Sequence, residues 1–163
     1  MSVTPAVEPI LAVHDLTVTF GQVTAVEALS LDIRPGETHA VVGESGSGKS
    51  VTALSIMGLV SAGSRGRIER GRIEYRTRRG EQLDLVQADN ARMREIRGNE
   101  ISMIFQEPLT SLNPVFTVGS QIAETLLLHQ GGNRESARSR ALEMLERVRI
   151  PEARKRLDEY PHQ

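Results

Sequence analysis

The stretch from residue 43 to residue 50 constrains this chain more than any other. It reads Gly-Glu-Ser-Gly-Ser-Gly-Lys-Ser, a full match to the phosphate-loop pattern G-x-x-x-x-G-K-[ST]. Its glycines allow a tight loop whose backbone N–H groups turn inward, and the positive end of the following helix completes a cradle for phosphate oxygens. We expect Lys49 to reach the β- and γ-phosphates and the hydroxyl of Ser50 to coordinate Mg²⁺.

The flanking residues supply the strand–loop–helix context that this pattern needs. Residues 38–42 are mostly apolar and predict a buried strand, and residues 51–60 predict a helix packed on most sides. The alternative is an ordinary turn rich in glycine and serine, which the complete pattern and its context disfavour. The loop therefore predicts a site for nucleotide phosphates.

Composition excludes several other kinds of site. The 163 residues can bury a substantial core, and 20 basic against 21 acidic side chains indicate no bulk polyanion as partner. The absence of cysteine excludes disulfides, thiolate zinc sites and cysteine nucleophiles. No signal-peptide pattern and no apolar stretch of about 18 residues occurs, so we expect membrane association to go through a partner.

The region before the loop predicts an antiparallel β structure. Apolar residues mark a first strand between residues 11 and 20, with alternation broken at His14-Asp15, and residues 28–33 alternate as a second strand. Residues 34–37 read Arg-Pro-Gly-Glu, which favours a type II turn. This turn would deliver the chain into the strand before the phosphate loop.

The region after the loop mixes strands with short helices. In the arginine- and glutamate-rich stretch 65–80, Ile73 and Tyr75 alternate with charged residues, which favours a half-exposed hairpin over a nucleic-acid patch. Residues 87–97 predict a surface helix capped by Asp89. Residues 101–105 predict a second apolar strand that ends at Gln106, and residues 109–114 predict a loop.

The remainder predicts helices. Apolar residues recur every fourth position from Val118 to Leu126, and Gly131-Gly132 ends that helix. A second apolar stripe predicts core, and Pro151 can open a third short helix; the stripe comprises Ala141, Met144, Leu145 and Val148. We therefore expect a core that carries the phosphate loop over residues 1–107 and a helical subdomain over residues 108–163.

These motifs in this order resemble the ATP-binding subunit of ABC transporters. Phe20 lies 29 residues before Lys49, where that family places an aromatic side chain that stacks on adenine, and Gln106 ends an apolar strand as the family's Q-loop glutamine does. The resemblance implies Mg²⁺ ligands at Ser50 and Gln106 and a catalytic role for Gln106. It also implies ATP contacts at Phe20, Gly43, Glu44, Ser45, Gly46, Ser47, Gly48, Lys49, Ser50 and Val51.

Two stretches resemble one branch of the family more closely. Residues 101–114 are similar to the ATPases of dipeptide, oligopeptide and nickel importers, and residues 115–119 and 128–130, with the charged hairpin, look most like glutathione importers. The resemblance implies ATP-driven peptide import at the cytoplasmic face of the membrane. It also implies contact with permease subunits around Glu107–Val118, a second ATP-binding subunit, and an extracytoplasmic binding protein indirectly.

The resemblance also defines what these residues do not contain. The signature L-S-G-G-Q, the Walker B aspartate, the catalytic glutamate and the switch histidine have no counterpart in the sequence. We therefore expect an α/β P-loop NTPase of the ABC type, with an N-terminal antiparallel β region and a helical subdomain, truncated before the signature motif. ATP hydrolysis needs a positioned water and charge stabilisation, so the chain alone is expected to be inactive.

Several alternatives remain at this point. The protein could be a soluble ABC protein of repair or translation, although it shows no zinc insert or long coiled coil. It could be a P-loop small-molecule kinase, which would not predict Phe20 or the strand end at Gln106, or a nucleotide-binding fragment without turnover. At the level of single residues, Phe20 could be a core aromatic, and Gln106 a satisfied strand-end amide.

Overall fold

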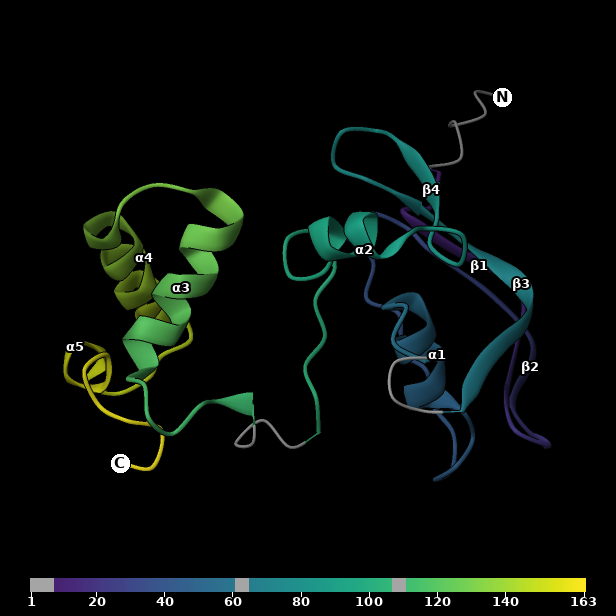
Figure 1. The fold of residues 1–163 in the computed structure, drawn as a ribbon, viewed down its shortest axis with the longest axis horizontal. Coiled ribbons are helices and arrows are strands. Elements are labelled where there is room, and N and C mark those ends of the chain that lie inside the picture. The colour runs from purple at the N-terminus through teal and green to yellow at the C-terminus, as the bar shows by residue number, and fades with distance from the viewer. Residues whose placement is uncertain (1–7, 61–64, 107–110) are drawn as a thin grey trace, which may run out of the picture. The chain divides into compact units, whose positions relative to one another are not determined.

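The structure is a computed structural model that describes residues 8–60, 65–106 and 111–163 (Figure 1). These residues form two compact units, which divide between Met103 and Ile104. Each unit has a hydrophobic core of its own.

The first unit is built on a four-stranded antiparallel sheet in the order β2-β1-β3-β4. One face of the sheet packs against both helices of the unit, because inward side chains of β1 and β3 share a core with apolar residues of α1 and α2. The elements are β1 Leu11–Phe20, β2 Val23–Ile33, α1 Lys49–Ile56, β3 Gly66–Arg76, β4 Gln82–Asp84 and α2 Asn90–Ile96.

The regular pairing of three neighbouring strands is interrupted between the residues that pair with Val13 and those that pair with Val18, and we call this interruption the crease. Asp15 on β1, Ala28 on β2 and Gly71 on β3 all have positive φ, at 48°, 46° and 101°. Side-chain oxygens replace ladder acceptors here: the N–H of Asp15 donates to Oγ of Ser30 (2.9 Å), and the N–H of Ala28 donates to Oγ1 of Thr17 (3.1 Å). The break in alternation predicted at His14-Asp15 is therefore confirmed as a β-bulge.

Two of the predicted strands are wrong. No described strand pairs with residues 38–42, and Val42 is 91% exposed. Within residues 101–105 only Ile101 makes a β-bridge, to Arg97, and Ile104 is 92% exposed. An apolar run indicates strand propensity, but a strand forms only where a neighbour supplies its hydrogen-bond partners, and the described residues supply none.

The polar helix predicted at 87–97 exists in a shorter form. The carboxylate of Asp89 caps α2 by accepting from the N–H of Arg92 (2.7 Å), as predicted. Met93 and Ile96 are buried against the sheet, so the helix is not wholly a surface element. Because residues three positions apart lie on the same face of a helix, these two side chains give the helix one face that packs on the sheet.

The second unit consists of three helices, α3 Val118–Gln130, α4 Arg134–Arg147 and α5 Ala153–Arg156. Gly131 ends α3 at φ 68°, as predicted. The predicted core stripe on α4 is correct for Ala141 and Leu145, which are buried, and wrong for Met144 and Val148, which are 42% and 68% exposed. The buried residues of this core are Leu126, Ala137, Ala141, Leu145, Ala153 and Leu157.

The third predicted helix starts later than expected. Pro151 lies in a turn, and α5 begins at Ala153. Glu152, between them, has φ 53°, so the chain passes through a left-handed position before it enters the helix.

Candidate functional site

The last glycine of the phosphate loop, Gly48, lies directly against strand β2. Gly48 is the N-cap of α1 with φ 85°, and a Cβ atom at this position would lie 2.4 Å from the carbonyl oxygen of Ala25 and 3.0 Å from Cγ2 of Val26. Only glycine meets both demands without strain. Glycine at position 48 therefore lets the loop end and α1 begin in close contact with the sheet.

The loop itself is tight. The N–H of Ser47 donates to the carbonyl oxygen of Glu44 (3.2 Å), and Gly46 has φ 84°. Gly43 faces the Ser47 hydroxyl so closely that a Cβ atom would lie 2.5 Å from Oγ. The predicted glycine pattern therefore forms a compact turn, with all of residues 43–47 exposed.

The start of α1 carries uncompensated positive potential. The helix has no side-chain cap and no acidic residue in its first turn. Its first N–H groups lack intrahelical partners by geometry, so they and the helix dipole favour an anion at this end. Ser50, exposed, and Val51, half-buried, belong to this first turn, next to Lys49.

The side chain of Lys49 folds back and donates hydrogen bonds to the loop. Its ammonium donates to the carbonyl oxygens of Gly43 (2.7 Å) and Glu44 (2.6 Å) and to Oγ of Ser47 (3.2 Å). These three acceptors are uncharged, so they satisfy the donors of the ammonium without neutralising its charge. The arrangement places a cation beside the helix start and can attract a polyanion such as a phosphate chain.

The turn before residues 38–42 has the predicted form. Gly36 has φ 75°, and the N–H of Glu37 donates to the carbonyl oxygen of Arg34 (3.1 Å). In return the N–H of Arg34 donates to Oε2 of Glu37 (2.9 Å), which lowers the pKa of that carboxyl; His39 lowers it further.

Phe20 lies at the end of β1 that faces the loop. It pairs with Val23 on β2 and with Gly66 on β3. The ring is half-buried and covers Gly66, where a Cβ atom would lie 2.6 Å from Cε1 of Phe20. Since the next residues of β2, Ala25 and Val26, contact Gly48, Phe20 and the loop share one end of the sheet.

Gln106 belongs to the second unit and is exposed. Its expected action on Mg²⁺ and water therefore stays a prediction. Residues 107–110, which begin the predicted permease contact, lie outside the described residues. Among the residues that the structure describes, no group of three His, Cys, Asp or Glu side chains is placed to hold a metal ion.

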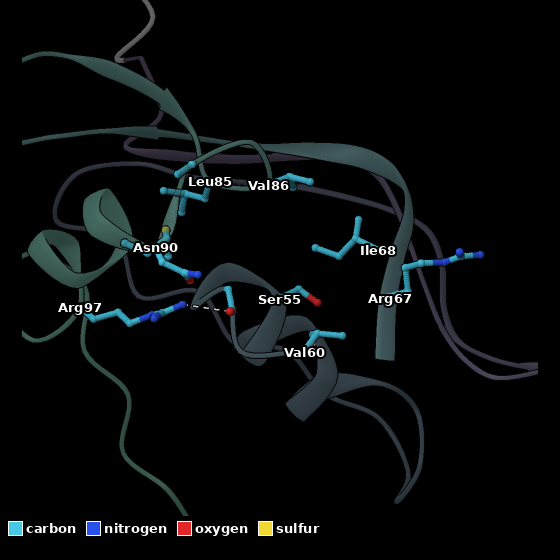
Figure 2. Close-up of a pocket in the computed structure, with 11 residues that line it drawn as sticks. Ser55, Val60, Arg67, Ile68, Leu85, Val86, Asn90 and Arg97 are labelled. Atoms are coloured by element: carbon cyan, nitrogen blue, oxygen red, sulfur yellow. Dashed lines mark hydrogen bonds between the residues drawn. The ribbon is translucent and has the colours of Figure 1, made fainter. Parts of the chain in front are cut away.

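A cavity of about 290 Å³ lies at the opposite end of α1, between that helix, β3 and α2 (Figure 2). Arg97 lines it and caps α1, because Nε donates to the carbonyl oxygen of Met57 (2.7 Å) and Nη2 to that of Gly58 (2.9 Å). Sequence reasoning missed this role, since nothing local links Arg97 to a helix about 40 residues earlier. The predicted site residues of the phosphate loop do not line this cavity.

Comparisons with known proteins agree with this geometry. A family profile described as "ABC transporter" matches residues 26–163. A Brucella abortus protein named for peptide import and ATP binding is 49% identical over 160 residues, covering 96% of this chain and 47% of that protein. The glutathione import ATP-binding protein GsiA of Salmonella typhimurium is 50% identical over 158 residues, covering 94% of this chain and 25% of GsiA.

Solved structures show the same fold. The ATP-binding cassette MJ0796, solved as a dimer in a post-hydrolysis state with ADP and Pi, matches with a TM-score of 0.75 at 24% identity, over 94% of this chain and 62% of that one. A component of the cbiONQ transporter complex of Clostridium perfringens matches with a TM-score of 0.67 at 22% identity, over 95% and 55%. The chain spans about half the length of the first curated relative, and a quarter of GsiA.

Proposed function

We propose, since the chain belongs to the ABC transporter family, that it acts in the ATP-binding subunit of an importer. The proposed cargo is a peptide, of the dipeptide, oligopeptide or glutathione type. The observation that carries the ATP-binding part of the proposal is the Lys49 ammonium, held among uncharged acceptors at an uncapped helix start. The relatives support the importer branch through their names, one for peptide import and one for glutathione import.

The loop 43–51 would hold the phosphates of ATP. Backbone N–H groups of the loop and of the first turn of α1 donate to phosphate oxygens, and Lys49 exchanges its carbonyl acceptors for charged ones. This exchange is favourable because the negatively charged phosphate oxygens add a Coulomb attraction that the neutral carbonyl oxygens do not offer. Phe20, at the same end of the sheet, would stack on adenine.

The residues present fit Mg²⁺ as a partner of the bound phosphates. Mg²⁺ keeps several waters and takes few protein ligands, so one hydroxyl, from Ser50, and one amide oxygen, from Gln106, suit it without an acidic cluster. When bound, the ion would neutralise charge on the phosphates. Ser50 would hold it at the helix start, and Gln106 would orient the attacking water.

The proposed partners are those that the family membership and the relatives' names suggest. Val115 and Phe116 are 68% and 54% exposed, and they lie in the described part, residues 111–118, of the contact with permease subunits proposed around Glu107–Val118. We propose a second ATP-binding subunit as a further partner, and an extracytoplasmic binding protein that acts through the permease. No helix within the described ranges is long and apolar enough to cross a bilayer. The proposed location is the cytoplasmic face of the membrane, through the permease.

Titration with Mg·ATP tests the site. Lys49→Ala should weaken binding by roughly one to two orders of magnitude, because it removes a charge-assisted contact worth about 1.5–3 kcal/mol. Lys155→Ala is the matched control: it removes the only other lysine, which is exposed on α5 and paired with Glu152 and Glu159. Equal affinities of the wild type and Lys49→Ala would overturn the phosphate-loop assignment.

A further inference from the structure

The ring of Phe20 lies across a glycine on the neighbouring strand. Phe20 ends β1 and pairs with Gly66, the first residue of β3. A Cβ atom on Gly66 would lie 2.6 Å from Cε1 of Phe20, closer than Cβ atoms come to other heavy atoms in proteins. The ring therefore takes up the space in which any other residue at position 66 would carry its side chain.

Backbone conformation does not explain why position 66 holds a glycine. The glycines of the phosphate loop that end left-handed turns, Gly46 and Gly48, have positive φ, and Gly66 does not. Within a strand, glycine has no side chain to pack and loses more conformational freedom on folding than other residues do. What glycine contributes at position 66 is thus the close contact with the ring of Phe20.

The atoms on the other side of Gly66 are held in place. The same Cβ atom would lie 2.7 Å from both Cγ1 and the carbonyl oxygen of Val60, which is 4% exposed. Val60 follows the end of α1, where Arg97 holds the carbonyl oxygens of Met57 and Gly58 (Figure 2). A buried backbone next to a capped helix end cannot move away, whereas an aromatic ring can rotate about its side-chain bonds. A side chain at position 66 would therefore displace the ring of Phe20.

We propose that Gly66 is a positioning residue for recognition of the adenine base, because it lets the ring of Phe20 rest between β3 and Val60 in the pose that stacks on the base. This inference rests on the proposed function and adds the residue that sets the pose of the stacking ring. A ring that is already ordered loses little rotamer freedom when the base binds, so more of the stacking energy appears as affinity.

The proposed role concerns the base and not the phosphates. The three atoms nearest to a Cβ atom at position 66 belong to Phe20 and Val60, and none belongs to the phosphate loop. Gly66→Ala should therefore turn the ring away from the base and leave the contacts of Lys49 as they are.

Binding of Mg·ATP and of inorganic tripolyphosphate with Mg²⁺ by the full chain separates the two parts of the nucleotide. Gly66→Ala should weaken ATP binding about tenfold, as Phe20→Ala does, and leave tripolyphosphate binding unchanged. The double variant should bind ATP no more weakly than Phe20→Ala alone, because the glycine acts only through the ring. Ile73→Val is the matched control: it thins the core at a fully buried position of the same strand, pairs with Val13 rather than Phe20, and should leave both affinities unchanged.

The outcomes distinguish this inference from the proposed function. Additive losses in the double variant, or unchanged ATP binding by Gly66→Ala when Phe20→Ala binds weakly, would overturn the role of Gly66 and leave the proposed function standing. If instead Lys49→Ala binds tripolyphosphate as tightly as the wild type does, or Phe20→Ala binds ATP as tightly, the proposed site itself fails and the role of Gly66 falls with it.

Nuclear Overhauser contacts in the wild-type chain decide the question if Gly66→Ala does not fold. Ring protons of Phe20 should contact Hα of Gly66 both without nucleotide and with Mg·ATP bound. The chain has only three phenylalanines, so loss of one ring's signals in Phe20→Ala identifies them. A contact that is absent without nucleotide, or that disappears when Mg·ATP binds, would show that Gly66 does not set the stacking pose and would overturn the proposal.

Discussion

Replacing Gly48 by alanine tests whether the phosphate loop is held by close approach to β2 rather than by its backbone conformation alone. Gly46 supplies the comparison, because it has almost the same φ, 84° against 85°, but an added Cβ atom there meets nothing within 4 Å. Gly46→Ala should therefore cost only the left-handed penalty, roughly 1–2 kcal/mol. Gly48→Ala adds a Cβ atom 2.4 Å from the Ala25 carbonyl oxygen, which must be relieved by moving α1 off the sheet.

Overpacking of this kind costs about 1–3 kcal/mol, so Gly48→Ala should destabilise the first unit by about 2–5 kcal/mol in total. Urea unfolding followed by far-UV circular dichroism measures both variants against the wild type, with the midpoint compared at constant slope. Gly48→Ala should unfold at the lower urea concentration of the two. Equal midpoints, or a larger loss for Gly46→Ala, would refute the argument from close approach.

Three further changes test separate features. Phe20→Ala should weaken ATP and GTP binding alike, by about 1–3 kcal/mol, and Phe20→Tyr should be nearly neutral, because stacking tolerates either base; unfolding with intact affinity in the folded fraction would make Phe20 a core residue. Burial, then the hydrogen bond to Glu100, raises the pKa of Tyr75 to about 12. The contribution of Tyr75 to stability should therefore be constant below pH 10 and be lost as pH rises from 10 to about 12, which a spectrophotometric titration with parallel unfolding curves would detect. Asp89→Ala should cost about 1 kcal/mol in unfolding free energy by removing the α2 cap, and Asp89→Ser should retain most of it.

Local patterns were sufficient for much of the fold. The bulge at Asp15, the cap at Asp89 and the helix end at Gly131 were all predictable, because each follows from a residue type and its immediate neighbours. The strands predicted at 38–42 and 101–105 were not, because strand formation depends on a partner that no local pattern reveals. Met144 and Val148 show the same limit on a helix: spacing places them on one face but does not say that anything covers it.

In the candidate site too, local features could be predicted from the sequence and those that depend on distant residues could not. The loop 43–50 was predictable since its chemistry is written in consecutive residues, and its glycines have the backbone angles that the pattern needs. The contacts of Arg97 and Gly66 could not be foreseen, because each is made with a residue about 40 or more positions away in the sequence. Glycine within a strand signals that something approaches closely, but not what approaches.

The crease in the first sheet bears on which insertions and deletions of residues its strands can accept. Five positions separate the pairs on either side of it along all three strands: from Val13 to Val18 on β1, and between their partners on β2 and β3. The extra residue of β1 is therefore compensated by one on each neighbour, so the register with β3 is restored from Val18 onward. With β2 it is restored at Val18 and shifts by one again between Val18 and Thr19. A deletion in one strand alone would leave two bulges unmatched or turn one half of that strand's core residues to solvent. An insertion or deletion at this level in one strand should therefore destabilise the sheet more than matched changes in all three strands.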